Sequence, residues 1–286
     1  MRRMPADALT TTDHVELLGA EADRFASSLT GADLDATVVT CPGWTVRDLV
    51  SHVGGLHRWS TELVASGIVT ETWRASLPLD YPDGAAPPEA WCEWLLAGAA
   101  EACRTFAAAE PTTPVWAWGA DQHARFWPRR MLFETAIHRL DLDTTLGRPA
   151  DLPSRVAVEG IDEQLENLPF VARWNGDVAR LRGRGERLGF TAVDSGASWR
   201  VRLDPDGWWW DRGSIPRTTH VMPSPVAGSH ESTGGIDPRR GSNGEDVVAE
   251  ATAVALLLLM VGRPVPDLVV RGDRALLDRW LAATAF

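Results

Sequence analysis

The chain has 286 residues, of which 44% are hydrophobic and 23% charged. These proportions are those of an ordinary globular protein and argue against a disordered or fibrous chain. At about 150 residues per domain, the length predicts two domains. The net charge of −11 argues against general nucleic-acid binding, which needs positive charge to neutralise phosphates.

Targeting and membrane signals are weak. The longest apolar run, residues 253–261, falls short of the ~20 residues that a membrane helix needs. The amino-terminal segment MRRMPADALTTTDHVELL has arginines but no apolar stretch typical of a secretory signal. We therefore expect a cytoplasmic protein that does not act on membranes.

The cysteines and the basic residues limit which bonds and catalytic mechanisms the chain can use. The three cysteines, Cys41, Cys92 and Cys103, form no CxxC motif and cannot all pair within one chain, so a disulfide framework is not expected. The 28 basic residues are all arginine. Because the chain has no ε-amine, Schiff-base and lysine general-base mechanisms are excluded.

The first half of the chain shows four helical patterns. Apolar spacing, a capping signal at Thr45 and Asp48, and a stop at Gly147 predict helices over about 13–29, 46–66, 88–109 and 128–146. Segments 70–87 and 111–127 are predicted as connections. The sequence therefore predicts a four-helix bundle as a first domain, residues 1–150.

After Pro149 the pattern changes. Helices are predicted over 154–168, 245–262 and 273–283, strands within 187–210 and over 267–272, and a long polar loop over about 211–246. Within this segment, Trp208, Trp209 and Trp210 are predicted as a strand with alternating buried and exposed rings. The second domain, residues 151–286, is thus a smaller α/β domain, and the whole chain is α+β and multidomain.

Two of the predicted helices carry side chains of the type that bind metals. His52 lies on the same stripe as Leu49 and Leu56, so it should point into the bundle. Glu134 and His138 are four residues apart, on one face of the fourth helix. Two histidines and a glutamate form a common catalytic zinc site with one open position. The alternative is a pair of core histidines that only hydrogen-bond.

Further polar residues near these helices allow two interpretations. Asp141 could orient the His138 imidazole from behind. Alternatively, Arg139, Asp141 and Asp143 form a solvated, charged helix end. His57 lies five residues after His52 and is predicted on another face, at the surface or rim.

The segments CPGWTVRDLVSHVGGLHRW and FETAIHRLDLDTTLGRP resemble the mycothiol-dependent maleylpyruvate isomerase family, within the wider group of DinB-like metal-binding bundles. The tail LLLLMVGRPVPDLVVRGDRALLDRWL is similar to that family's sterol-carrier-like second domain. The resemblance implies His52, Glu134 and His138 as ligands of zinc or another divalent metal. The arginine-rich composition also suits an actinobacterial source, where mycothiol is the cellular thiol.

The resemblance further implies a reaction. A zinc-bound thiolate of mycothiol would add to a cis-conjugated dicarboxylate of the maleylpyruvate type, and rotation and elimination would give the trans isomer. Related members transfer mycothiol to other small electrophiles. Because arginine suits carboxylates, Arg263 is the candidate catalytic residue, and Arg271 is the candidate for binding the cofactor thiol. The alternative for each arginine is a surface ion pair, for example with Asp267 or Asp273.

Two other functions stay open at this point. One is a metal-dependent hydrolase that uses zinc-bound water, although the sequence offers no clear general base beyond Glu134. The other is a non-catalytic, metal-containing protein that binds a small ligand. In each case the expected partners are small molecules, a low-molecular-weight thiol among them for the enzyme, and the protein is expected to be a monomer or small homo-oligomer.

Overall fold

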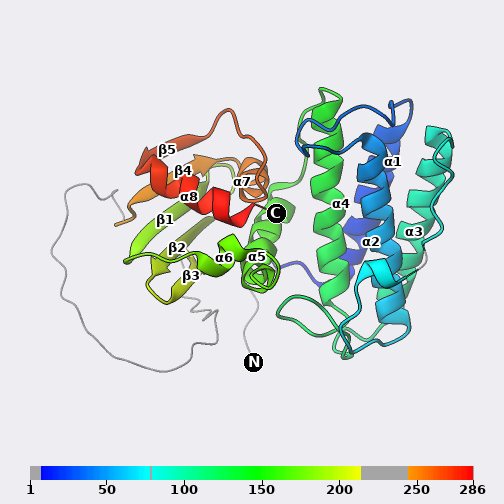
Figure 1. Cartoon of the computed structure of the whole chain (residues 1–286), viewed down its shortest axis with the longest axis horizontal. Helices are drawn as coiled ribbons and strands as arrows, with labels where there is room; N and C mark the ends of the chain where they lie inside the picture. Colours follow the sequence, from blue (N-terminus) through cyan, green and yellow to red (C-terminus); the bar gives the residue numbers. More distant parts are fainter. Residues whose placement is uncertain (1–7, 78, 214–243, 286) are drawn as a thin grey trace. The chain divides into compact units, whose positions relative to one another are not determined.

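The computed structural model describes residues 8–77, 79–213 and 244–285 (Figure 1). The chain divides into two compact units, Met1–Leu152 and Pro153–Phe286. Most of the polar loop predicted over 211–246 lies outside the described residues. Its first residues belong to a strand, which ends at Arg212.

The first unit is a bundle of four long helices, which lie side by side in Figure 1. They are α1 (Thr11–Leu29), α2 (Val46–Ala65), α3 (Pro88–Ala108) and α4 (Phe126–Thr145), with a short 3₁₀ turn η1 (Arg74–Ser76) between α2 and α3. Each of α1 and α2 packs against both α3 and α4. The predicted four-helix architecture is confirmed, and the contact of α2 with α4 brings the two ligand-bearing helices together.

Local signals set the ends of these helices. The Thr45 side chain accepts a hydrogen bond from the Asp48 backbone N–H, and the Asp48 carboxylate accepts one from the Thr45 backbone N–H, which is a capping box. Just before it, Gly43 has a φ of 84°, a left-handed conformation that glycine adopts without strain. This turn places Trp44 at the start of α2.

The second unit is a five-stranded sheet with helices packed on it. Its elements are α5 (Ser154–Val171), α6 (Gly176–Arg180), β1 (Glu186–Ala192), β2 (Ser198–Asp204), β3 (Gly207–Arg212), β4 (Val247–Ala251), α7 (Ala253–Met260), β5 (Val269–Gly272) and α8 (Arg274–Thr284). The strand order is β3-β2-β1-β4-β5. Only the β1–β4 pair is parallel among the four pairs described. The fold class is therefore α+β and multidomain, as predicted.

The side chains of the sheet alternate as strands require. Trp208 and Trp210 are buried and Trp209 is half-buried, which confirms the predicted pattern. The Trp208 ring meets the Trp280 ring of α8 edge to face, with centroids 5.2 Å apart. The Trp199 indole of β2 donates a hydrogen bond to Asp162 of α5 at 2.8 Å. These contacts fix two helices to the sheet.

One predicted element is wrong. The segment 245–262 was predicted as a single helix, but it contains β4, then α7. Val247, Ala249 and Ala251 are buried in alternation, and this segment pairs in parallel with β1. The short segment before α7 adjoins a continuous apolar run, so the sequence does not separate the two elements, and pairing with β1 makes the first of them a strand.

Among the described residues, we find no helix that has both the length and the apolar character required to span a membrane.

Candidate metal centre

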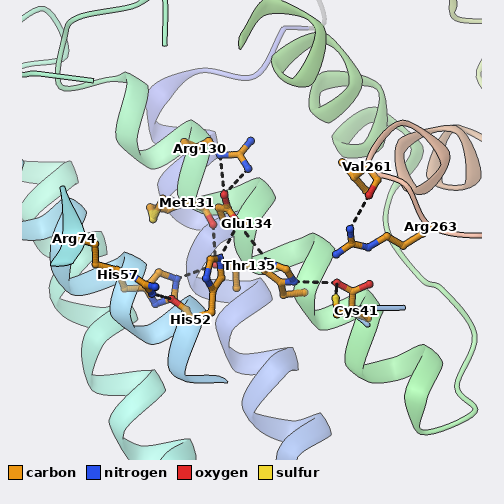
Figure 2. Close-up of polar contacts among 12 residues, drawn as sticks. Cys41, His52, His57, Arg74, Arg130, Met131, Glu134, Thr135, Val261 and Arg263 are labelled. Carbon is orange, nitrogen blue, oxygen red and sulfur yellow. Dashed lines mark hydrogen bonds and ion pairs between the residues drawn. The ribbon is translucent and has the colours of Figure 1, made fainter. Parts of the chain in front are cut away.

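The three predicted ligands come together in the first unit. His52 comes from α2, and Glu134 and His138 come from consecutive turns of α4. Glu134 Oε2 lies 3.6 Å from His52 Nε2 and 3.5 Å from His138 Nε2. The two imidazole rings stand nearly perpendicular, with centroids 4.9 Å apart. All three ligand atoms lie within 4.8 Å of one another (Figure 2).

This spacing suits a small divalent ion. Zinc binds nitrogen and oxygen at about 2.0–2.2 Å, so neighbouring ligand atoms of a tetrahedral site are about 3.3–3.6 Å apart. Both measured separations from Glu134 fall in that range, and they are long for direct hydrogen bonds. The donor set of two imidazoles and one carboxylate is one that zinc accepts while keeping a further position for another ligand.

Glu134 is held by a buried arginine. Arg130, one turn earlier on α4, donates from Nε to Glu134 Oε1 at 3.0 Å and also from Nη2 to the same oxygen. Burial alone would raise the pKa of the Glu134 carboxyl. The charge of Arg130 and the contacts with His138 and His52 outweigh burial and hold this pKa well below its usual range. Glu134 is therefore an anion, as a metal ligand must be.

His138 is held from its other nitrogen. Its Nδ1 lies 2.9 Å from Asp141 Oδ2, which also accepts a hydrogen bond from Cys41 Sγ at 3.3 Å. Thr40 donates to Asp141 Oδ1 at 2.6 Å. Burial lowers the pKa of His138, but Asp141, Cys41 and Glu134 outweigh it and raise this pKa to about 10. The bond to Asp141 turns Nε2 toward Glu134 and His52.

Cys41, His138 and Asp141 also form a second group whose ligand atoms lie within 4.8 Å of one another. One oxygen of Asp141, Oδ2, accepts hydrogen bonds from both His138 and Cys41. These contacts indicate a hydrogen-bond network that supports His138. Asp141 thus contacts His138, as one of the two interpretations of the sequence expects, and Cys41 is buried.

Trp44 packs against both imidazoles, and Arg74 contacts the backbone of His52. The Trp44 ring stacks on His138 with centroids 5.7 Å apart and lies 5.0 Å from the His52 ring. Arg74 of η1 donates to the His52 carbonyl at 3.2 Å. Burial lowers the pKa of His52, while Glu134 raises it and His138 and Arg74 lower it further. The net lowering of the His52 pKa favours the neutral imidazole, which is the form that binds a metal.

His57 is not a surface residue, and its predicted place is wrong. Its side chain is fully buried, and Nε2 lies 2.8 Å from the Thr135 hydroxyl of α4. The prediction failed because α2 packs against α3 and α4 together, so its buried face is wider than one stripe. Burial, with a smaller contribution from Arg58, lowers the pKa of His57 to about 3.

The alternative of a solvated charged end on α4 is also wrong. Arg139, Asp141 and Asp143 are all buried. Arg139 donates to Glu21 of α1 and to Asp143, at 2.6 Å each. Because α1 packs along α4, these charges are paired between helices instead of facing water.

The two predicted arginines lie in the second unit. Arg263 follows α7, and its Nη1 donates to the Val261 carbonyl at 2.6 Å. Arg271 lies on β5, with its side chain 72% exposed, and pairs with Glu250 of β4 at 2.9 Å. The structure thus brings together His52, Glu134 and His138, and it places both arginines outside the unit that holds them.

Sequence reasoning did not find Arg130, Trp44 or Thr40 as neighbours of the site. Arg130 carries a signal, since it precedes Glu134 by one helical turn. Trp44 and Thr40 carry none, because the turn before α2 reaches α4 only in the folded bundle.

The comparisons with known proteins agree with this architecture. A family model described as the mycothiol maleylpyruvate isomerase N-terminal domain matches residues 15–143, which is most of the first unit. No curated protein sequence matches the chain.

Two solved structures are similar to the chain. One is a crystal structure of the mycothiol-dependent maleylpyruvate isomerase, with 14% identity and a TM-score of 0.56. The other is a histidine-to-alanine mutant of an enzyme described in the same words, with 14% identity and a TM-score of 0.58. Each match covers 92% of this chain and 93% of the other.

At this identity the two structures show a shared fold. The family model adds the sequence pattern of the first unit, which contains all three candidate ligands. Over residues 15–143, the first unit is similar to the mycothiol maleylpyruvate isomerase N-terminal domain.

Proposed function

We propose that the protein is an enzyme that binds zinc through His52, Glu134 and His138 and uses mycothiol as its thiol cofactor. The observation that carries the proposal is the convergence of these three side chains at tetrahedral spacing, inside a unit that matches the family model. A solved structure with the same fold is described as a mycothiol-dependent isomerase, which supports the choice of thiol.

The chemistry follows from the ligands and their supports. A zinc ion at this centre supplies Lewis acidity, which favours the deprotonated form of a thiol. Asp141 holds Nδ1 of His138 so that Nε2 faces the centre. Arg130 holds Glu134 as an anion. Trp44 packs against both imidazoles.

The proposed substrate is a cis-conjugated dicarboxylate of the maleylpyruvate type. A thiolate held at the centre would supply reversible addition to this double bond, with the electron pair passing to the conjugated carbonyl. Rotation about the resulting single bond and elimination would then give the trans isomer. The thiol is regenerated, so isomerisation consumes none, whereas transfer to a small electrophile would consume one thiol for each product.

Hydrolysis is the weaker proposal on this geometry. A zinc-water mechanism needs a general base beside the ion. One oxygen of Glu134 accepts hydrogen bonds from Arg130, and the other oxygen faces both histidines. It serves as a ligand instead of a base.

The first test is metal content together with thiol binding. Purified wild-type protein should contain about one zinc per chain, and H52A should lose it. Mycothiol should raise the melting temperature of the wild type only when metal is present. A folded wild type without affinity for zinc and without response to mycothiol would leave two core histidines and overturn the proposal.

The second test separates isomerisation from transfer. The cis dicarboxylate is incubated with enzyme and a limiting amount of mycothiol, and the vinylic proton couplings are followed by NMR. Isomerisation should give many turnovers for each thiol, with the free thiol concentration unchanged. Loss of free thiol in proportion to product would indicate transfer.

Arg263 stays the proposed substrate-binding residue and Arg271 the proposed thiol-binding residue. R263A and R271A are a matched pair, because both lie in the second unit and both arginines have contacts there. We expect R263A to raise KM for the dicarboxylate and R271A to raise KM for mycothiol, each about tenfold or more. Unchanged KM values would remove that arginine from the mechanism.

A further inference from the structure

Arg130 is the buried cation that pairs with Glu134 at the centre. It is 6% exposed, although a buried arginine is costly unless its charge is compensated. Its guanidinium carbon lies 5.5 Å from the Trp118 ring centroid, which fixes the group from the side. Two of its nitrogens, Nε and Nη2, donate to the same atom, Glu134 Oε1.

The two oxygens of Glu134 therefore have different surroundings. Oε1 accepts both hydrogen bonds from Arg130, while Oε2 lies 3.5 and 3.6 Å from the two imidazole nitrogens (Figure 2). A carboxylate can bind a metal through one oxygen or through both, and the second mode uses one more coordination position. Two donors on Oε1 oppose that second mode.

We propose that Arg130 is a positioning residue that keeps Glu134 a one-oxygen ligand and so preserves an open position for the thiol. This inference rests on the proposed metal site. Under this inference, Asp141 and Arg130 have opposite effects on the electron donation of the ligands that they contact. Asp141 increases the electron donation of His138, whereas the cation of Arg130 decreases that of Glu134. The decrease leaves more positive charge on the ion to hold a thiolate.

The test uses cobalt(II) in place of zinc, because the visible absorption of cobalt depends on its coordination number and is strongest for four ligands. Full-length wild type, R130M and R130K are loaded with cobalt, and the cobalt content of each sample is measured. Spectra are recorded alone and during titration with mycothiol. The matched control is R139M, since Arg139 is also buried on α4 but pairs with Glu21 and Asp143.

We expect R130M to bind cobalt with weaker visible bands than the wild type, because Glu134 gains a second bond to the ion. The mycothiol concentration at which the sulfur-to-cobalt charge-transfer band reaches half of its final intensity should rise about tenfold or more. This is the size of effect typical of changes to residues that support metal ligands. R130K keeps the charge but loses the two-nitrogen contact, so its spectrum should be intermediate. R139M should have the wild-type spectrum even if it melts earlier.

Three results would overturn the inference. One is a cobalt-loaded R130M with the wild-type spectrum and thiol titration. Another is a folded R130M that takes up no cobalt, since Arg130 would then be required for binding itself. The third is an R139M spectrum altered like that of R130M. If R130M does not fold, the cobalt spectrum and mycothiol titration of R130K are compared with those of the wild type instead. A wild type that binds no cobalt would instead contradict the proposed function.

Discussion

At the scale of single residues, Asp141 shows how much the candidate site depends on its supports. It accepts hydrogen bonds from Thr40, Cys41 and His138, and the last of these orients a ligand. We expect D141N to lower zinc affinity by about 10–100-fold, because the amide is a poorer acceptor for Nδ1 and makes Nε2 less basic. Competition with a chromophoric chelator measures this change.

The control for D141N is D143N. Asp143 is also a buried aspartate of α4, but it pairs with Arg139 and Ser28. D143N should lower the free energy of unfolding and leave zinc affinity within about twofold, since it touches no ligand. Equal losses of affinity in both variants would mean that general loosening of α4, and not the bond to His138, weakens the site.

At the scale of elements, the close approach of α2 and α3 depends on a glycine. A Cβ at Gly54 would lie 2.1 Å from Cζ3 of Trp94, which is buried in the core of the first unit. G54A should therefore destabilise the protein by about 1–3 kcal/mol despite the better helix propensity of alanine. Urea denaturation followed by circular dichroism measures the difference.

Gly19 of α1 provides the comparison. Its Cβ would meet only Cys103 Sγ, at an ordinary 3.8 Å. G19A should be neutral or stabilising by up to about 1 kcal/mol, the propensity difference between the two residues. If G54A were equally well tolerated, the Trp94 ring would have room to move and α2 would not be fixed against α3 at this point.

In the second unit, Asp162 links α5 to the sheet. It accepts a hydrogen bond from Trp199 and lies 3.2 Å from Arg212 Nε. Burial is the largest effect and raises the pKa of Asp162 to about 6, although Arg212 and Trp199 oppose it. The usual value is 3.8. Between these values the folded state binds a proton that the unfolded state releases.

This difference predicts a pH dependence. The contribution of Asp162 to stability is present below about pH 4 and is lost as pH rises through about 6. D162N lacks this titration, so the free energy of unfolding of the wild type should fall relative to that of D162N by up to about 3 kcal/mol between pH 4 and 7. Parallel denaturation profiles for the two proteins over this range would contradict the prediction.

At the scale of the whole molecule, each of the two units has its own core. Calorimetry should therefore resolve two unfolding transitions, or one transition with a calorimetric enthalpy above the van't Hoff value. A chelator should lower the melting temperature of the first unit alone, because the candidate ligands all lie there. At pH 7, D162N should shift only the transition of the second unit. A chelator that shifted the transition of the second unit, or a D162N substitution that shifted that of the first, would contradict this prediction.

Local patterns in the sequence are sufficient to predict the helices of the first unit and its three candidate ligands. Helical spacing, the capping box at Thr45 and the stop at Gly147 are local signals, and a residue's face follows from its position along the helix. His52, Glu134 and His138 could be found because each lies on the packed side of a helix whose limits the sequence sets.

The surroundings of those candidate ligands depend on contacts that form only in the folded bundle. Thr40 and Cys41 lie about 100 positions before Asp141, so no local pattern joins them. The burial of His57, Arg139 and Asp143 depends on which helices pack together, and β4 became a strand by pairing with β1. These features are long-range contacts, which hydrophobic periodicity does not encode because it records the face of an element and not its partner.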